Sequence, residues 1–334
     1  MGTIGPKALL DTIGGTPLVG LTRLLPDCPA RLFAKLESFN PGGSAKDRSA
    51  QAIVAEALAS GRIGRGSTLV ESSSGNFAVA LARLALLHDM KAVCVVDPRT
   101  NPATLAIVRA LGAEVVPVTE PDPDTGDWLV ARLTRVRELV DERPDAVWLD
   151  QYSNRAAVRA HADGTMREVD LALGGDVDWV FVATSTTGTI AGCLAHVERA
   201  GLGTRVVAVD AAGSVLFGGE RGTRLLAGYG AGIVPALAEG LTPHAVARIP
   251  DDEAVVGTRA LALREGVLAG ASAGAVAAAV ARLAPQLSGN VVLILHDGGQ
   301  PYASTVFDDA WVEAEVGVSP DTLAARVAAF GEGA

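Results

Sequence analysis

The stretch Asn40-Pro41-Gly42-Gly43-Ser44-Ala45-Lys46-Asp47-Arg48 joins a glycine-rich turn to an apolar run of helical period. Proline fixes φ and glycine accepts positive φ, so the first four residues break regular structure. From Ser44 the apolar positions recur at helix spacing, which predicts a helix with Ser44 as its N-cap. Lys46 then lies in the first turn, where the helix dipole disfavours a cation. Such a lysine is either a slightly strained surface residue or an amine held near neutrality for chemistry.

Strand and helix patterns alternate along the rest of the chain. β-Branched runs predict strands at 32–37, 68–71, 92–96, 114–118, 146–149, 178–183, 205–209 and 291–295. Helical patterns at 77–87, 104–111, 128–140 and 269–284 separate several of them. Buried runs divided by helices predict mostly parallel sheets covered on both faces. The glycine-rich segment 211–243 is expected to be a long functional loop, and 305–334 a closing helical region.

Composition restricts the class of protein. The chain has 334 residues, 49% of them hydrophobic, and a formal net charge of −10. An extended basic face for nucleic acid is therefore not expected. Three widely spaced cysteines suggest neither disulfides nor a metal site, which fits a reducing cytoplasm. No signal pattern and no apolar run of about 18 residues is found, so no membrane association is expected.

Glu71-Ser72-Ser73-Ser74-Gly75-Asn76-Phe77 links a predicted strand to a predicted helix. Hydroxyl groups, a glycine and free helix N–H groups converge there at the positive end of the helix dipole, which suits an anion. A serine-rich N-cap with no ligand explains the same pattern about equally well.

A second small-residue turn, Ser185-Thr186-Thr187-Gly188-Thr189, follows the strand that ends at Ala183. Strand, turn and helix in this order hold phosphate groups in many α/β proteins. The turn lacks the Gly-Lys-Ser/Thr element, so it is not a P-loop.

Gly270-Ala271-Ser272-Ala273-Gly274 matches the nucleophile elbow of α/β-hydrolases. Those enzymes need an acid and then a histidine later in the chain. Beyond Ser272 the only histidine is His296, with no well-placed acid between them. A hydrolase is therefore disfavoured.

Taken together, these motifs resemble the cysteine synthase family of fold-type II pyridoxal-phosphate (PLP) enzymes. The Lys46 stretch resembles that family's Schiff-base motif. Gly14-Gly15-Thr16-Pro17-Leu18 resembles its opening, and the segment from His296 to Thr305 resembles its close. The matches follow the family order over most of the chain.

The resemblance implies the fold and the partners. It implies two three-layer α/β lobes with mostly parallel sheets. Residues 1–43 and 155–334 would form the larger, PLP-binding lobe, and 44–154 an inserted smaller lobe that closes on substrate. The protein would be a cytoplasmic homodimer that acts on small amino-acid substrates, with no metal.

The resemblance also implies roles for individual residues. Lys46 would form the internal aldimine and then remove the Cα proton. Ser272 would face the pyridine nitrogen, leaving it largely unprotonated, so that elimination is favoured. Asn76 would bond the phenolic oxygen of the cofactor. The remaining implied contacts are to the cofactor phosphate, from Ser185, Thr186, Thr187, Gly188 and Thr189, and to the substrate carboxylate, from Ser73, Ser74, Asn76 and Phe77.

Two departures from the sulfide-using pattern suggest the substrates. Tyr152 follows Gln151 where the family has phenylalanine, and Ser185 replaces a glycine. These resemble the 2,3-diaminopropionate branch, which serves siderophore and antibiotic pathways. That branch joins O-phospho-L-serine to L-glutamate, through an aminoacrylate intermediate, giving N-(2-amino-2-carboxyethyl)-L-glutamate and phosphate. Arg221 and Arg224 are candidates for binding the leaving phosphate, although an ordinary solvated pair is equally plausible. The alternatives are a cysteine synthase using O-acetylserine or O-phosphoserine with sulfide, and a catalytically idle PLP or small-anion binding protein.

Overall fold

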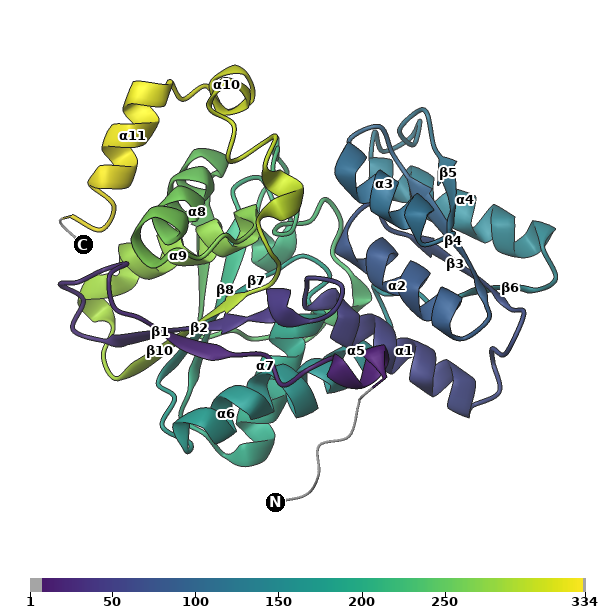
Figure 1. The fold of residues 1–334 in the computed structure, drawn as a ribbon, viewed down its shortest axis with the longest axis horizontal. Helices are drawn as coiled ribbons and strands as arrows, with labels where there is room; N and C mark the ends of the chain where they lie inside the picture. The colour runs from purple at the N-terminus through teal and green to yellow at the C-terminus, as the bar shows by residue number, and fades with distance from the viewer. Residues whose placement is uncertain (1–7, 333–334) are drawn as a thin grey trace.

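The computed structural model describes residues 8–332 and contains two sheets, each flanked by helices (Figure 1). The larger sheet has the strand order β1-β2-β10-β7-β8-β9, and the smaller has the order β5-β4-β3-β6. Every pair is parallel except β1 with β2. The strands are β1 (Leu18–Leu21), β2 (Arg31–Leu36), β3 (Thr68–Ser72), β4 (Lys91–Val96), β5 (Glu114–Pro117), β6 (Ala146–Trp148), β7 (Trp179–Ala183), β8 (Arg205–Ala211), β9 (Ala245–Ile249) and β10 (Asn290–Leu295).

Eleven α-helices connect and cover these strands within the described residues. They are α1 (Lys46–Ala59), α2 (Asn76–Leu87), α3 (Pro102–Ala110), α4 (Trp128–Glu142), α5 (Ala156–Ala160), α6 (Arg167–Leu173), α7 (Gly188–Ala200), α8 (Asp251–Glu265), α9 (Ala271–Leu283), α10 (Asp309–Trp311) and α11 (Pro320–Ala328). A π-helical segment, His161–Met166, joins α5 to α6. No helix of residues 8–332 is long and apolar enough to cross a bilayer.

The larger sheet is the middle layer of three. Successive residues of β7 point to opposite faces, as a strand requires. Phe181 packs with α8 and α9 on one face, whereas Val180 and Val182 pack with α6 and α7 on the other. All three side chains are fully buried. Burying an aliphatic or aromatic side chain stabilises the fold by roughly 1.5–3 kcal/mol, so both helical layers are held firmly.

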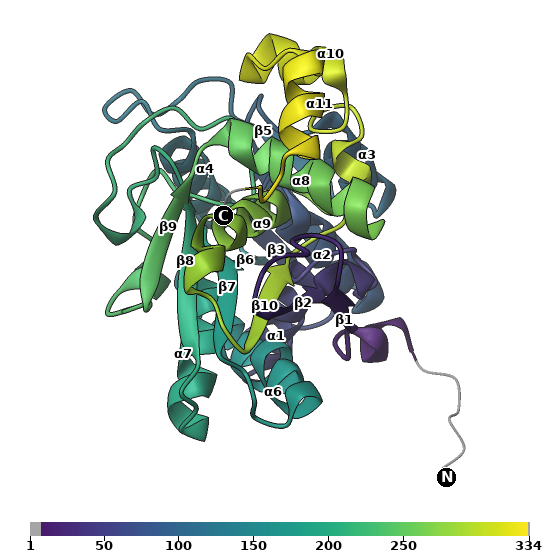
Figure 2. The ribbon, with the colours of Figure 1, turned by 90° about the vertical axis from the view of Figure 1, so that its left-hand side faces the viewer.

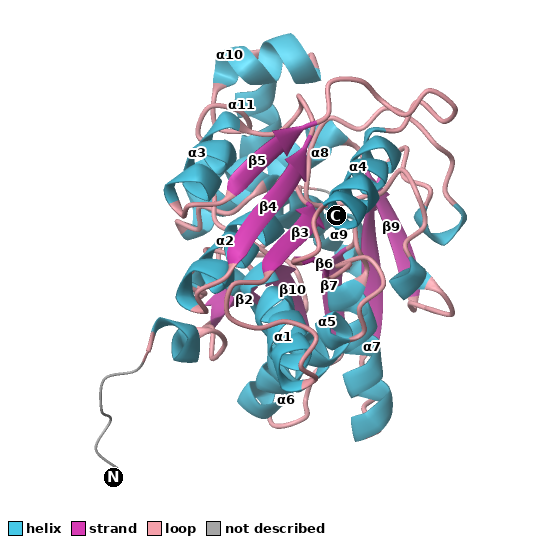
Figure 3. Cartoon of the chain, turned by 90° about the vertical axis from the view of Figure 1, so that its right-hand side faces the viewer, coloured by secondary structure: helices cyan, strands magenta, loops and turns pink. Residues whose placement is uncertain are grey.

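The smaller sheet has the same three-layer plan (Figure 3). Leu69 and Cys94 pack toward α2, whereas Val70 and Val95 pack toward α4. Cys94 of β4 is buried. The hydrophobic core on the α2 side also includes Ala156 of α5, because α5 packs against α1.

The predicted strands and helices are confirmed, but strand β1 and helices α5, α6 and α8 were not predicted. Two further differences lie at the far edge of the larger sheet. The segment 211–243 is a loop, as expected, but it contains two single turns of 3₁₀-helix, Leu216–Gly218 and Ala236–Ala238. Strand β9 was not predicted. It is a five-residue edge strand beside β8 (Figure 2), and four of its residues are only partly buried. Because so little of it is buried, its sequence lacks the continuous apolar run that predicted the other strands.

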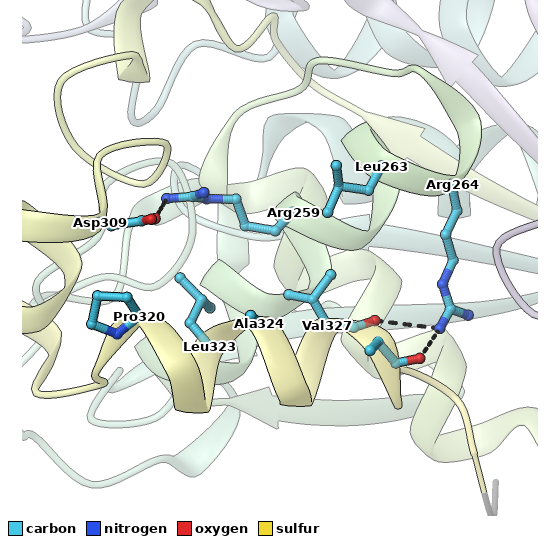
Figure 4. A pocket seen from close by; sticks show the side chains of 9 residues that line it. Arg259, Leu263, Arg264, Asp309, Pro320, Leu323, Ala324 and Val327 are labelled. Atoms are coloured by element: carbon cyan, nitrogen blue, oxygen red, sulfur yellow. Dashed lines mark hydrogen bonds and ion pairs between the residues drawn. The ribbon is translucent and has the colours of Figure 1, made fainter.

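The closing helical region lies on the outside of α8 (Figure 4). Arg264 of α8 donates to carbonyl oxygens at the end of α11, and Arg259 pairs with Asp309 at 2.7 Å. A cavity of about 350 Å³ lies between α8 and α11, and none of the predicted site residues lines it. The chemistry must therefore be sought at the carboxyl ends of the parallel strands.

Candidate active site

Lys46 is the first residue of α1, and the turn before it is attached to the larger sheet. The Ala45 amide donates to the carbonyl oxygen of His296 at 2.8 Å, and Ser44 forms a bridge with Asp297. The prediction of Ser44 as N-cap is wrong by one position. Ala45 occupies the N-cap, and the Ser44 hydroxyl accepts from the Lys46 amide at 3.2 Å. Contacts with residues far along the chain thus set the start of the helix.

The amine of Lys46 lies in surroundings that favour its neutral form. Burial lowers the pKa of Lys46, and the charge of Asp297 opposes this to a smaller extent. Burial also lowers the pKa of His296, to about 3, so this neighbour is neutral and adds no competing charge. A neutral amine is what attack on a carbonyl carbon requires.

Asn76 and Asp297 meet beside this lysine. Asn76 Nδ2 donates to Asp297 Oδ2 at 2.7 Å, and the Tyr302 hydroxyl donates to the same oxygen at 2.7 Å. The other carboxylate oxygen of Asp297 is buried without a partner within residues 8–332. The closing motif of the sequence is therefore part of the site.

The serine-rich turn lies between β3 and α2. Ser73 accepts from the Ala78 amide at 3.0 Å, and Ser74 accepts from Arg132 Nη1 at 3.1 Å. Gly75, the N-cap of α2, offers no side-chain cap, and Ser73 occupies only the Ala78 amide, so the N–H groups of Asn76 and Phe77 are open to an anion. Phe77 is buried in the core, which leaves only its backbone for binding.

Gln151 and Tyr152 follow β6 and are joined to the same turn. Gln151 Nε2 donates to the Ser72 carbonyl oxygen at 3.0 Å. The Tyr152 hydroxyl reaches that oxygen only at 3.5 Å, a weak contact that leaves it free for a better partner. Burial raises the pKa of Tyr152 to about 12, so the hydroxyl is a donor at neutral pH.

The second small-residue turn begins α7, a helix of 13 residues without a side-chain cap. Thr187 is its N-cap and has a φ of +63°, a left-handed conformation that is uncommon for a β-branched residue. Glycine would occupy this position without strain. Thr189 lies 3.3 Å from His161 Nε2, which also contacts Ser49 of α1 at 2.9 Å. His161 therefore links the two helices that begin at the site.

Ser272 is the second residue of α9 and is buried. The loop residue Gly228 lies against it so closely that a Cβ there would come within 3.3 Å of Ser272 Cβ. Neither ring nitrogen of His296 has a hydrogen-bond partner within residues 8–332. Ser272 and His296 are thus not paired with each other, which agrees with disfavouring a hydrolase built on this motif.

The two loop arginines lie in different settings. Arg221 pairs with Asp127 at 2.9 Å, bonds the Gly232 carbonyl, and its side chain is 54% exposed. Arg224 is half-buried, its Nε is buried without a partner in the described residues, and burial lowers its pKa. Arg224 is therefore the better placed of the two for an anion.

Arg132 was not predicted as a site residue. It lies on α4, is buried, and contacts Ser74, while its Nε lies 3.4 Å from Asp97 Oδ2. In the sequence it is one polar position of an amphipathic helix, with nothing to separate it from surface arginines. Only the packing of α4 on the smaller sheet reveals it.

A buried ionic network holds α1 in place. Arg48 donates to Glu37 at 2.7 and 3.0 Å and to Glu168 at 2.7 Å twice. Lys35 donates to Glu168 at 2.6 Å, and Thr16 accepts from Arg48 at 3.1 Å. The network joins α1 to β2 and α6 two residues after Lys46.

Comparison with known proteins places these features in a family. Residues 9–298 match the family model described as pyridoxal-phosphate dependent enzyme. The chain belongs to the pyridoxal-phosphate-dependent enzyme family. The expected α/β fold, the PLP cofactor and enzymatic activity are thereby confirmed.

Two curated relatives of this PLP enzyme carry the name N-(2-amino-2-carboxyethyl)-L-glutamate synthase. The protein from Ralstonia nicotianae is 42% identical over 92% of this chain and 91% of its own length. The protein from Cupriavidus metallidurans is 41% identical over the same shares. Among solved structures, the O-acetylserine-dependent cystathionine β-synthase of Helicobacter pylori is 30% identical, with a TM-score of 0.84 over 91% of this chain and 99% of that one. A hydrogen sulfide-producing enzyme from Fusobacterium nucleatum is 27% identical, with a TM-score of 0.83 over 89% and 100%.

The residues at the site fit PLP. The uncapped start of α7 suits its phosphate, and the Ser272 hydroxyl suits its ring nitrogen. A side chain at Gly228 would crowd Ser272, so the absence of one keeps that position accessible. Lys46 supplies an amine of lowered pKa for the aldehyde.

Proposed function

We propose that this PLP enzyme joins O-phospho-L-serine to L-glutamate, giving N-(2-amino-2-carboxyethyl)-L-glutamate and phosphate for 2,3-diaminopropionate biosynthesis. The observation that carries the proposal is the 41–42% identity, across 92% of the chain, to two synthases of that name. The arginines near the substrate turn support it, because both substrates are anionic.

The cofactor, when bound, supplies the electron sink that weakens the Cα–H and Cβ–O bonds. Lys46, whose lowered pKa favours the neutral amine, would hold the cofactor and is the residue that would take the proton from Cα. The open start of α2, with Ser73 and Ser74, binds the substrate carboxylate. Asn76, which donates to Asp297 in this structure, would hold the phenolic oxygen of the cofactor.

The phosphate leaving group requires a cation. Arg224 is the candidate, because its half-buried guanidinium has an Nε without a partner in the described residues. Arg132 adds a buried guanidinium next to Ser74. A dianionic phosphate gains more from such groups than a neutral acetate ester does.

The selection of glutamate rests on Tyr152 and Ser185. The Tyr152 hydroxyl has only a 3.5 Å contact, and Ser185 is partly exposed at the start of the cofactor turn. Both therefore retain hydrogen-bonding capacity for a polar nucleophile. Sulfide needs no such partners.

The two-lobe organisation completes the proposal. Of the described residues, 8–43 and 155–332 form the PLP-binding lobe, and 44–154 form the lobe that closes on substrate. The sheet order supports this division, because β1 and β2 pair within the larger sheet and β3–β6 form the smaller one. The enzyme acts in the cytoplasm as a homodimer.

A cysteine synthase is the second candidate, since the solved structures include O-acetylserine-dependent and sulfide-producing enzymes. Phosphate release from O-phosphoserine, measured with glutamate or sulfide present, separates the two. The proposal predicts multiple turnovers with glutamate and few with sulfide. Preferred turnover with sulfide would favour cysteine synthase, and no turnover with either would favour an idle PLP-binding protein.

A further inference from the structure

Arg99 lies beside the substrate turn without belonging to any of the predicted motifs. It follows β4, which pairs in parallel with β3 so that Val95 faces Ser72. The residues after both strands therefore leave the smaller sheet at the same edge. Arg99 follows β4 there as Ser74 follows β3.

A carboxylate fixes the Arg99 guanidinium from one side. Arg99 Nε donates to Asp97 Oδ1 at 3.1 Å, and Nη2 donates to Oδ2 at 2.9 Å. Although burial alone would raise it, the hydrogen bonds from Arg99 and the charge of Arg132 lower the pKa of Asp97. Asp97 is therefore anionic and bridges Arg99 to Arg132, which contacts Ser74.

The opposite edge of the guanidinium remains available. Within residues 8–332 Nη1 of Arg99 makes no hydrogen bond, and the side chain is 60% exposed. The Trp128 ring lies 5.6 Å from the guanidinium carbon. A guanidinium held by a carboxylate and an aromatic ring is pre-organised, so little ordering cost remains when its free edge binds a second carboxylate.

The surroundings carry an excess of positive charge. Arg99 lies near enough to Arg224, on the facing loop, to lower the pKa of Arg224 further, after the larger effect of burial. Arg132 and Arg221 complete a group of four arginines, which faces three aspartates, Asp97, Asp127 and Asp210. A local excess of one positive charge therefore remains, on a chain of net charge −10.

We infer that Arg99 binds the side-chain carboxylate of the second substrate and thereby selects a dicarboxylic amino acid. The inference rests on the proposed function. In the proposed function the first substrate places its carboxylate at the open start of α2, whereas the Arg99 side chain is 60% exposed. The amine of the second substrate must reach the reacting carbon, so its far carboxylate points outward, toward the exposed guanidinium.

The test compares L-glutamate with L-glutamine, which has nearly the same shape but a neutral side chain. The kcat/KM for each is measured in the PLP-loaded wild-type enzyme and in Arg99→Gln, with O-phosphoserine saturating. Loss of one charge-assisted contact should reduce the kcat/KM for glutamate by about ten-fold to a hundred-fold. Glutamine use should change little, so the glutamate-to-glutamine ratio should collapse. Arg99→Lys, which retains the charge, should restore part of that ratio.

Arg143→Gln is the matched control. Arg143 also donates two hydrogen bonds of 2.8 Å to a carboxylate, that of Glu114. Glu114 is the first residue of β5, so this pair lies at the amino ends of the strands, away from Arg99. Arg143→Gln should leave the ratio unchanged. An unchanged ratio in Arg99→Gln, or equal losses with both amino acids, would overturn the glutamate subsite alone. A wild-type enzyme that accepts sulfide and not glutamate would instead overturn the proposed function, and the subsite with it.

Discussion

Arg48→Met should destabilise the protein strongly, because Arg48 holds the helix that begins with Lys46. The substitution removes five hydrogen bonds, four of them to Glu37 and Glu168. Glu37 is fully buried and would lose its only cationic partner within the described residues. Breaking a buried ion pair from one side costs about 3–5 kcal/mol. That is a large part of a typical unfolding free energy of about 5–15 kcal/mol.

Urea unfolding of the PLP-loaded protein, followed by circular dichroism, measures this loss. Arg159→Met is the control, because Arg159 pairs with Glu56 at the surface, where both side chains are 56% exposed. It should cost less than about 1 kcal/mol. Arg48→Lys keeps the charge, so its loss of unfolding free energy should lie between those of Arg48→Met and Arg159→Met. A loss below about 1 kcal/mol for Arg48→Met would refute the claim that this network fixes α1.

Four further predictions concern the site and its support. Lys46→Ala should abolish both turnover and covalent capture of PLP by borohydride, measured by protein mass; capture on another lysine would contradict its role. Tyr152→Phe with Ser185→Gly should reduce glutamate addition by roughly ten-fold to a hundred-fold while sulfide addition is kept; parallel losses would show that the pair only shapes the pocket. Arg224→Gln should impair O-phosphoserine use far more than O-acetylserine use in steady-state assays, whereas equal losses would make Arg224 a loop support. Finally, although burial alone would raise it, hydrogen bonds within the ionic network lower the pKa of Glu168 from 4.5 to about 2. Ionised Glu168 therefore contributes its full stabilisation above about pH 4.5, and this contribution is lost as the pH falls toward 2. In acid unfolding, the free energy of unfolding of Glu168→Gln should decline less steeply over that range than that of the wild-type protein. Equal declines in the two proteins would contradict the lowered pKa.

Local signals in the sequence were enough to identify the segments that we propose bind the cofactor. The glycine-rich turn before Lys46, and the turns at 73–77 and 185–189, are each short motifs between a strand and a helix. Their chemistry depends on free N–H groups at helix starts, which local sequence encodes. The parallel sheets could also be predicted from local sequence, because continuous apolar runs such as 178–183 are typical of strands buried on both faces.

The parts that escaped prediction depend on contacts between distant segments. Arg132 reaches Ser74 only because α4 packs on β3. Asp97 forms ion pairs with both Arg132 and Arg99, and Arg132 is far from it in the sequence. The start of α1 shifted from its expected cap because residues 296–298 bind the turn before it. Edge strand β9 is short and half-exposed, so its periodicity is faint. Local sequence patterns therefore do not predict these features.

Product identity tests the central claim most directly. The PLP-loaded enzyme is supplied with O-phosphoserine and equal concentrations of ¹⁵N-labelled glutamate and sulfide, and the products are separated by mass. The account predicts that most product is the labelled adduct of glutamate with the three-carbon unit of serine, formed with an equal amount of phosphate. Cysteine as the main product would contradict it.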